Sequence, residues 1–417
     1  MFYYHKWGWT VFGILTQPPK AIMKTSDIII IGAGPASLAF ARHFKGSDLT
    51  LTIIEKSPLD DIARPSYDGR EIALTHRSRE IMLNLGAWQR IPDDEIYRLT
   101  DAKVYNGDFG DALHFKVPKD LSILTSIDRL GNLISNHNIR QALYDEVKDL
   151  PNVQILTSQN IQDITTNENQ ALVKLANDEI LTSKLLIGAD SRLSFVRKKM
   201  GIGAMMNDFG RTVIVFRVSH PLSNEGTARE CFLYGRTLAL LPLHDKLTNC
   251  VITLDNTQAN EFLAMNKDEL ALEVQRMMGD RLGKLSLAGT IHHYPLMGVH
   301  AKTFIGNRVA LIGDSAVGMH PVTAHGFNLG LLGANTLATL ILNAHHNNQD
   351  IASTALLQKY NTRHQAHTRP LYHGTNLMVK IFTNDAKPMH AVRDLTLKVS
   401  NHLPPIKRWI AGQLTGK

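Results

Sequence analysis

The segment from Asp27 to Ser37 constrains the fold more than any other part of this 417-residue chain. It reads DIIIIGAGPAS, so four consecutive isoleucines run directly into a glycine-rich turn. An apolar run without alternation is typical of a central parallel strand that is covered on both faces. The next residues, from Leu38 to Phe44, are compatible with a helix. We therefore expect a strand, a tight turn and a helix, which together open a doubly wound α/β fold.

The glycines of this turn predict a dinucleotide-binding site. Gly32 permits the tight turn, Gly34 lets the backbone approach a pyrophosphate, and the N-terminus of the following helix attracts the anion. Ser37 replaces the third glycine of the usual pattern and is small enough for close helix packing. The next expected strand, Leu51–Ile54, ends at Glu55, where an acid accepts hydrogen bonds from ribose hydroxyls. This acid does not decide between NAD and FAD, and the glycine pattern alone leaves open a plain strand-to-helix turn.

Two later segments repeat the pattern of a strand followed by a polar glycine turn. The first begins at Leu185 and reads LLIGADSRLSFVRKKMGI, and the second begins at Val309 and reads VALIGDSAVGMHPVTAHGFNLGLLGANTLA. In a doubly wound sheet such turns lie together at the carboxyl ends of the strands, where an extended dinucleotide binds. Two residues of the first segment also have simpler interpretations, Asp190 as a helix cap and Arg197 as a surface charge.

The three motifs, in this order and spacing, resemble the FAD-dependent aromatic hydroxylases related to para-hydroxybenzoate hydroxylase, over nearly the whole chain. REIALTHRSREIMLNLGAW (from Arg70), LALLPL (from Leu238) and the ending IFTND…LPPIKRWIAGQLTG are more similar to the ubiquinone-biosynthesis branch than to phenol degraders. The resemblance implies an α/β protein in which a Rossmann-like, three-layer FAD-binding domain is interleaved with an antiparallel-sheet substrate domain. A C-terminal helical region follows.

The expected domain boundaries follow this pattern. FAD-binding parts are expected at 23–100, 128–205 and 301–345, substrate-domain parts at 101–127 and 206–300, and a basic helical region at 346–417. Residues 1–22 form an extension before Met23 that is consistent with an upstream translational start.

The expected substrate domain contains segments with a period of two, which predicts an antiparallel sheet above the flavin. These segments are Thr212–Val218, Glu230–Tyr234, Leu238–Leu241 and Asn249–Leu254. Phe216, Phe232 and Leu240 are candidates to line the substrate pocket, with ordinary core packing as the alternative. A helix on the outer side of this sheet is expected at Lys267–Leu285.

The resemblance also assigns residues to the cofactor. It implies contacts to the ADP half of FAD from Gly32, Gly34, Ser37 and Glu55, and to the pyrophosphate region from Arg70 and Asn136. Asn136 precedes a helix expected at Ile139–Val147. The resemblance also implies contacts to the ribityl chain or pyrophosphate from Gly313 and Asp314, and to the isoalloxazine ring from Pro321, Gly326, Asn328 and Leu329. Asp190 belongs to a turn that the family uses for both FAD and NAD(P)H. The catalytic candidates are Pro321 and His325, which stands where the family commonly has glutamine and whose imidazole titrates near neutrality.

The reaction implied by the resemblance is hydroxylation of the aromatic ring of a polyprenyl phenol or quinol in ubiquinone biosynthesis. In such enzymes NAD(P)H reduces the flavin, which adds O2 to form a C4a-hydroperoxide, while the protein positions the ring and excludes water. Two alternatives stay open. One is an FAD-dependent reductase or dehydrogenase of an isoprenoid or quinone, and the other is a flavin-binding scaffold of a quinone-biosynthesis complex.

Cysteine and histidine usage bears on the compartment and on metals. Cys231 and Cys250 fit neither a disulfide framework nor a zinc-ligand spacing, so they favour a reducing cytoplasm. The histidine pairs, His292-His293 and His364 with His367, have no third ligand in view, and the second pair is expected to face solvent. No metal site is therefore expected.

Charge is concentrated at the C-terminus. From Lys359 to the end there are ten Lys and Arg residues and two acids. This excess predicts peripheral contact with an anionic inner-membrane surface or with a biosynthetic complex, and no nucleic-acid-binding module is found. A solvated basic face is the alternative. No segment is expected to span a membrane, since the longest apolar run, Trp7–Leu15, is too short.

Overall fold

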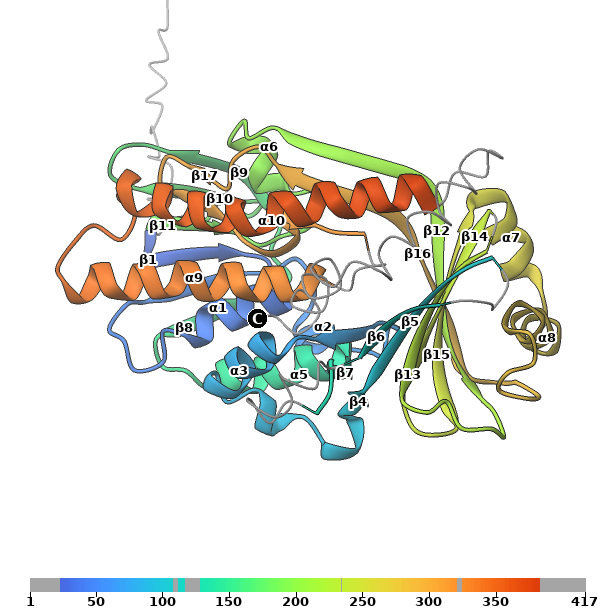
Figure 1. Ribbon diagram of the computed structural model, residues 1–417. Coiled ribbons are helices and arrows are strands. Elements are labelled where there is room, and N and C mark those ends of the chain that lie inside the picture. The colour runs from blue at the N-terminus through green and yellow to red at the C-terminus, as the bar shows by residue number, and fades with distance from the viewer. Residues whose placement is uncertain (1–22, 108–111, 117–127, 234, 321–324, 383–417) are drawn as a thin grey trace, which may run out of the picture.

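The computed structural model describes residues 23–107, 112–116, 128–233, 235–320 and 325–382, which form two lobes (Figure 1). The expected extension at 1–22 lies outside these residues. The first lobe is built on a sheet with the strand order β17-β18-β11-β1-β2-β8, to which β10 and β9 add on β11. The strands are β1 Met23–Ile31, β2 Leu51–Ile54, β8 Val153–Leu156, β9 Ile161–Thr166, β10 Ala171–Leu175, β11 Ile180–Gly188, β17 Ile305–Gly306 and β18 Val309–Leu311.

Buried isoleucines form the centre of this sheet, as the sequence predicts. Ile28–Ile31 in β1 are all buried, and all four residues of β2 are buried as well. β1 pairs in parallel with both β2 and β11, so the apolar run is covered on both faces. The helix after the turn begins earlier than expected, because Pro35 occupies its first position, where the missing amide hydrogen carries no cost.

The helices of the first lobe pack on this sheet and on one another. They are α1 Pro35–Arg42, α2 Leu59–Ala63, α3 His76–Asn84, α5 Asn136–Val147, α6 Phe195–Lys199, α9 Gly326–His346 and α10 Thr354–Phe382, with short 3-10 turns η1 Trp88–Arg90, η2 Asp93–Glu95 and η3 Gly313–Ser315. Figure 1 shows α9 and α10 running side by side, and the two helices are in contact with each other. A small sheet, β3 Glu71–Leu74, β7 Gly131–Ser135 and β4 Tyr97–Leu99, completes the lobe.

Helix α9 corrects one expectation from the sequence. By length and composition it could cross a membrane, so the expectation that Trp7–Leu15 is the longest apolar segment was wrong. However, 61% of its most apolar window is buried inside the protein, where it packs against α1, α3 and α10. A core helix of a globular protein passes the same compositional test, so this is weak evidence for a span.

The second lobe is a sheet in the order β19-β16-β12-β15-β14-β13-β5-β6. Its strands are β5 Asp101–Asn106, β6 Ala112–Lys116, β12 Ala204–Ser219, β13 Thr227–Leu233, β14 Arg236–Pro242, β15 Leu247–Asp255, β16 Ser286–Ala301 and β19 Val317–Gly318. Neighbours are antiparallel except β13 and β5. The predicted fold class, with a Rossmann-like part, an antiparallel sheet and a helix at 354–382, is confirmed, whereas the domain boundaries stay a prediction.

Two helices, α7 Asn256–Ala264 and α8 Lys267–Met278, cover the outer face of this sheet (Figure 1). The expected helix at 267–285 ends early, because Gly279 adopts a left-handed conformation with φ of 62° and caps α8. Both cysteines are buried, and Cys231 and Cys250 pack in the core between the sheet and these helices. Phe216 belongs to the same core.

Replacing Phe216 with Ala should lower the free energy of unfolding by about 3–5 kcal/mol, because the side chain is fully buried under α7 and α8. Chemical denaturation measures the change. The control, Leu272→Ala, alters an α8 residue that is 47% exposed and should stay within about 0.5 kcal/mol of wild type. Equal effects of the two substitutions would contradict the packing of these helices on the sheet.

Candidate functional site

The three glycine turns lie side by side at the carboxyl ends of neighbouring strands. β1 and β11 are parallel with Ile31 opposite Gly188, and β11 and β18 are parallel with Gly188 opposite Leu311. The turns that follow these strands therefore converge on one edge of the sheet. In doubly wound sheets this edge is where ligands bind.

Gly32 and Gly34 serve the first turn in different ways. Gly32 has φ of +100°, and a β-carbon there would lie 2.5 Å from the carbonyl oxygen of Ala189. Backbone conformation and the close approach of the second motif both require glycine here. A β-carbon on Gly34 would meet no atom within 4 Å, and this residue lines a cavity between the two lobes. The space in front of Gly34 is thus available to a ligand.

Glu55 and Ser37 complete the first motif. The Glu55 carboxylate accepts hydrogen bonds from the amides of Ala33 (2.7 Å) and Ser57 (2.9 Å), which fix it beside the turn, where it lines the cavity. Ser37 is buried in α1, the helix that packs against α9, and it does not line the cavity. Its position fits the helix-packing part of the third glycine, and a contact with the cofactor stays a prediction.

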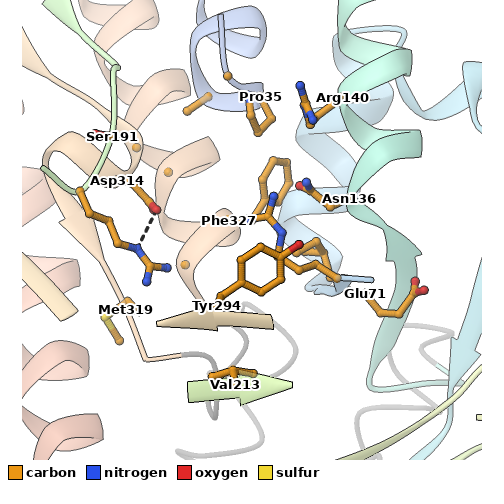
Figure 2. Close-up of a pocket in the computed structure, with 18 of the residues that line it drawn as sticks. Pro35, Glu71, Asn136, Arg140, Ser191, Val213, Tyr294, Asp314, Met319 and Phe327 are labelled. Atoms are coloured by element: carbon orange, nitrogen blue, oxygen red, sulfur yellow. Dashed lines mark hydrogen bonds and ion pairs between the residues drawn. The ribbon is translucent and has the colours of Figure 1, made fainter. Parts of the chain in front are cut away.

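A cationic wall faces the third motif across the cavity. Arg70 donates to Asp68 at 2.5 Å, and the amide of Asn136 donates to the same carboxylate oxygen at 2.7 Å. Burial opposes ionisation of Asp68, but these two donors hold its pKa below the usual value. Arg140 also lines this wall, and Figure 2 shows Asn136 and Arg140 across the cavity from Asp314. Because Asn136 is the first residue of α5, a helix N-terminus joins the two arginines there.

The second motif combines a cap with a cavity-lining residue. Asp190 accepts hydrogen bonds from the amides of Phe195 (2.5 Å) and Val196 (3.3 Å), so it caps α6, and it also lines the cavity. Arg197 is not a surface charge. It is buried and donates to the carbonyl oxygen of Ser315 at 2.7 Å, which ties the second motif to the third.

Asp314 in the third motif forms an ion pair with Arg192 at 2.9 Å, drawn as the dashed line in Figure 2. Arg192 also donates to the carbonyl oxygen of Met297 in β16, so the pair connects the glycine turns with the second lobe. Gly313 has φ of +60°, and a β-carbon there would lie 2.9 Å from that of Ala36. The first and third turns are therefore in close contact.

The ring-side residues of the third motif are divided between cavity and core. Gly326 begins α9, lines the cavity and has open space where a β-carbon would lie. The Asn328 side chain instead forms hydrogen bonds with the backbone at the end of β3. It accepts one from the Thr75 amide and donates one to the Ala73 carbonyl oxygen. Leu329 is buried in the core.

The structure does not place either of the two catalytic candidates, His325 and Pro321, on the cavity wall. His325 is a buried residue at the N-cap of α9, and it is not among the residues that line the cavity. Pro321 lies outside the described residues. Their roles, like those of Asn328 and Leu329 at the flavin, stay predictions.

The glycine turns and the second lobe enclose one continuous cavity of about 670 Å³. The register of the sheet shows which side chains face it. One row of paired residues is Glu230, Ala239, Val251 and Val215, and the next contains Thr237, Thr253, Val213 and Tyr294; all eight line the cavity. The side chain of Tyr294 lies in the middle of the view in Figure 2, and its hydroxyl donates to the Asp68 carbonyl oxygen.

Two of the three residues predicted to line the pocket face the other way. Phe216 and Leu240 both pair with Cys250 and pack in the core under α7 and α8. Side chains alternate along a strand, so Val215, one position away, faces the cavity instead. Phe232 pairs with Thr237 and so shares the cavity face of the sheet, but it does not line the cavity itself.

Comparisons with known proteins agree with this geometry. The family described as "FAD binding domain" matches residues 25–374. The chain belongs to this family. It is 53% identical to the ubiquinone hydroxylase UbiM of Neisseria meningitidis, over 94% of this chain and 85% of that protein. It is 27% identical to the ubiquinone hydroxylase UbiL of Rhodospirillum rubrum, over 92% and 88% of the two chains.

Solved structures agree on the fold of this FAD-binding protein. The crystal structure of p-nitrophenol 4-monooxygenase PnpA from Pseudomonas putida superposes with a TM-score of 0.74 at 17% identity, over 94% of this chain and 99% of that chain. At this identity the likeness concerns the fold alone. The resemblance inferred from the three motifs is confirmed by the family match and the relatives.

The residues present fit FAD. Gly34 in the first turn and Gly326 at the start of α9 both line the cavity and have open space at the β-carbon position. Arg70, Arg140 and the N-terminus of α5 offer positive charge for a pyrophosphate. The acid Glu55 lies at the end of β2, where a ribose is bound in such folds.

Several cavity residues were missed by the sequence analysis. Arg140, Arg192, Glu230, Tyr294 and His320 line the cavity, but no local motif marks them except for Arg192, which directly follows the Gly-Ala-Asp-Ser turn. Burial, with the nearby arginines, lowers the pKa of His320 to about 4, so this imidazole is neutral at neutral pH.

The surroundings of the histidine pairs show no arrangement of metal ligands among the described residues. Within the described residues no three His, Cys, Asp or Glu side chains converge as metal ligands would. His364, which was expected to face solvent, is buried: its ring stacks on Tyr360, and burial lowers its pKa to about 3. It packs so closely on α9 that a β-carbon at Gly333 would lie 2.7 Å from it.

Replacing Gly34 with Val should weaken FAD binding by about tenfold or more, because a branched side chain would fill the space that the pyrophosphate needs. The measurement is the flavin-to-protein ratio after purification and the affinity of the apoprotein for added FAD. Gly374→Val is the control: this exposed residue of α10 also has open space at its β-carbon, but it lies away from the cavity. Full flavin occupancy in the Gly34 variant would show that the cradle is wrongly assigned.

Proposed function

We propose that the protein is an FAD-dependent monooxygenase that hydroxylates the aromatic ring of a polyprenylated phenol or quinol in ubiquinone biosynthesis, using NAD(P)H and O2. The observation that carries the proposal is the single cavity that joins the glycine turns to a largely apolar sheet face. The similarity to UbiM and UbiL, both named ubiquinone hydroxylases, supports the substrate class. Reduced FAD activates O2 and supplies the oxygen atom that enters the ring.

The chain's own residues bind and orient the cofactor. Arg70 and Arg140 neutralise the pyrophosphate together with the N-terminus of α5, and Gly34 lets the backbone approach it. Glu55 accepts hydrogen bonds from the ribose. Asp314, held by Arg192, would bind the ribityl chain or the pyrophosphate.

The sheet face positions the substrate. Val213, Val215, Ala239 and Val251 present short apolar side chains, which leave room for an aromatic ring and favour an isoprenoid substituent over water. Exclusion of water protects the reactive flavin from side reactions, and a fixed ring position brings the attacked carbon close to the oxygen.

With purified protein, FAD and a phenol carrying one isoprene unit, NAD(P)H oxidation and O2 uptake should both rise on adding substrate. Isotopically labelled O2 should place one labelled atom in the product. A reductase or dehydrogenase would give no label and no substrate-dependent O2 uptake, and a scaffold would show no substrate-stimulated NAD(P)H oxidation. Gly374→Val serves as the active control and Gly34→Val as the flavin-poor one. In a deletion strain, profiling of quinone intermediates identifies the ring position.

We further propose that the protein works in the cytoplasm, in peripheral contact with the inner membrane where a polyprenylated substrate resides. The cations of α10 support this, because Lys359, Arg363, Arg369 and Lys380 are all exposed. The residues beyond 382, including Lys407, Arg408, Trp409 and Ile410, lie outside the described structure, and their sequence combines cations with apolar anchors. Packing of this tail on its own domain, on a second subunit or in a biosynthetic complex is the alternative.

The full chain should sediment with vesicles that contain anionic lipid, and binding should weaken with salt, since each basic residue near such a surface contributes about 1 kcal/mol. Truncation after Asn401 should reduce binding. Vesicles of neutral lipid are the control. If full-length and truncated proteins behave alike and independently of salt, the tail is a packing element.

A further inference from the structure

Five carboxylate side chains line the cavity, and one of them differs from the rest. Glu55, Glu71, Asp190 and Asp314 each accept hydrogen bonds from backbone amides or arginine side chains. Glu230 lines the same cavity, but its carboxyl has no hydrogen bond or ion pair with any other described residue. The Glu230 side chain is partly buried, and a carboxyl that lines a cavity without a protein partner is a candidate to bind a ligand there.

The register of the second sheet explains why Glu230 faces the substrate space. It pairs with Ala239 of β14, which pairs with Val251 of β15, which in turn pairs with Val215 of β12. On its other side Glu230 pairs with Val104 of β5. The carboxyl therefore stands at the end of an apolar row on the cavity face, and its own neighbour Cys231 points to the opposite core.

No described charge compensates this carboxyl. Burial alone raises the pKa of Glu230 to about 8. The paired residues on both flanking strands are uncharged, and the charged or titratable groups elsewhere on the cavity wall, including Arg70, Arg192, His320 and Tyr294, do not contribute to the shift. A carboxyl in such surroundings changes its charge in the range where a base works at neutral to mildly alkaline pH.

We propose that Glu230 binds the ring hydroxyl of the phenolic substrate and accepts its proton as the ring is hydroxylated; this rests on the proposed function. The O–H bond of the substrate breaks and a new O–H bond forms on the Glu230 carboxylate. The electron pair left on the ring oxygen increases the electron density of the ring carbon that attacks the oxygen atom supplied through the flavin. As aromaticity returns, that carbon releases its own proton to water, and Glu230 returns its proton to the ring oxygen.

The other polar groups on the sheet side of the cavity are less suited to this step. Thr237 and Thr253 offer hydroxyls, which form hydrogen bonds but do not take a proton near neutral pH. The Tyr294 hydroxyl already donates to the Asp68 carbonyl oxygen. His320 has a pKa of about 4 and is a weak base. Glu230 is thus the group on this side whose ionisation matches the task.

Glu230→Gln tests the proposal, because it keeps the shape of the side chain but cannot take the proton. The probes are 2-prenylphenol with one isoprene unit and its methyl ether, which has no hydroxyl proton. Binding is followed by the change in flavin absorbance, and turnover by hydroxylated product at several pH values. In the wild type, kcat/KM should rise with pH through about 8. In Glu230→Gln this rise should disappear, and kcat should fall by about 10²–10⁴-fold.

Binding gives a second readout that does not depend on turnover. The wild type should bind the phenol more tightly than the methyl ether, and Glu230→Gln should lose most of this preference. Glu230→Asp retains the carboxyl and should keep the pH-dependent rise at a lower rate, which also covers the case of a poorly folded Gln variant. Glu225→Gln, an exposed residue just before the same strand, is the matched control and should leave both readouts unchanged.

The results separate this proposal from the proposed function. Wild-type turnover and pH dependence in Glu230→Gln would overturn the role of Glu230 while leaving the monooxygenase intact. If the wild type binds FAD but hydroxylates none of the phenols, the proposed function fails. The role of Glu230 is then decided by binding: the same preference for phenol over methyl ether in both proteins, at every pH, would overturn it.

Discussion

The parallel alignment of β1, β11 and β18 is the constraint on which the rest of the structure depends. It brings three turns within van der Waals contact, and there is no room for side chains between them: β-carbons at Gly32 and Gly313 would collide with the neighbouring turns. Buried Arg197 then holds the second turn to the third through the Ser315 carbonyl oxygen. A cradle assembled from segments far apart in the chain therefore behaves as one rigid surface, which is what an extended cofactor needs.

Polar contacts between the lobes fix the sheet of the second lobe relative to the glycine turns. Arg192 joins Asp314 of the cradle to the backbone of β16, and Tyr294 of β16 donates to the carbonyl oxygen of Asp68. A third link is the pair of Glu71 and Arg217, in which burial raises the pKa of Glu71 and the arginine opposes that rise. The sheet that roofs the cavity is thus fixed relative to the glycine turns, so the distance between ring and cofactor is set by the protein.

Much of the fold could be predicted from local sequence, and the exceptions share a cause. The isoleucine run of β1 and the glycine turns are encoded within a few residues, so their structure was expected correctly. Which face of each strand in the second lobe lines the cavity was not predicted correctly. Helices α7 and α8 cover one face of the sheet and the cavity lies on the other, so both Phe216 and Val215 are apolar and buried. Alternation of polarity carries no information there. Arg140 and Tyr294 line the cavity through long-range packing that no local pattern reveals.

The position of Glu230 on the cavity face cannot be predicted from the sequence, but the register of the sheet shows it. In the sequence it lies between Arg229 and Cys231 and reads as an ordinary strand residue. Only the pairing with Ala239 and, through it, Val251 shows that a carboxyl stands at the end of an apolar row that faces the cavity. A desolvated carboxyl without a partner destabilises the folded protein progressively as pH rises from 4.5 to about 8, since the folded state holds its proton up to a pKa of about 8 whereas the unfolded chain releases it near the ordinary value of 4.5. An isosteric apolar residue would avoid that cost, so the carboxyl is best explained by a substrate group that completes it.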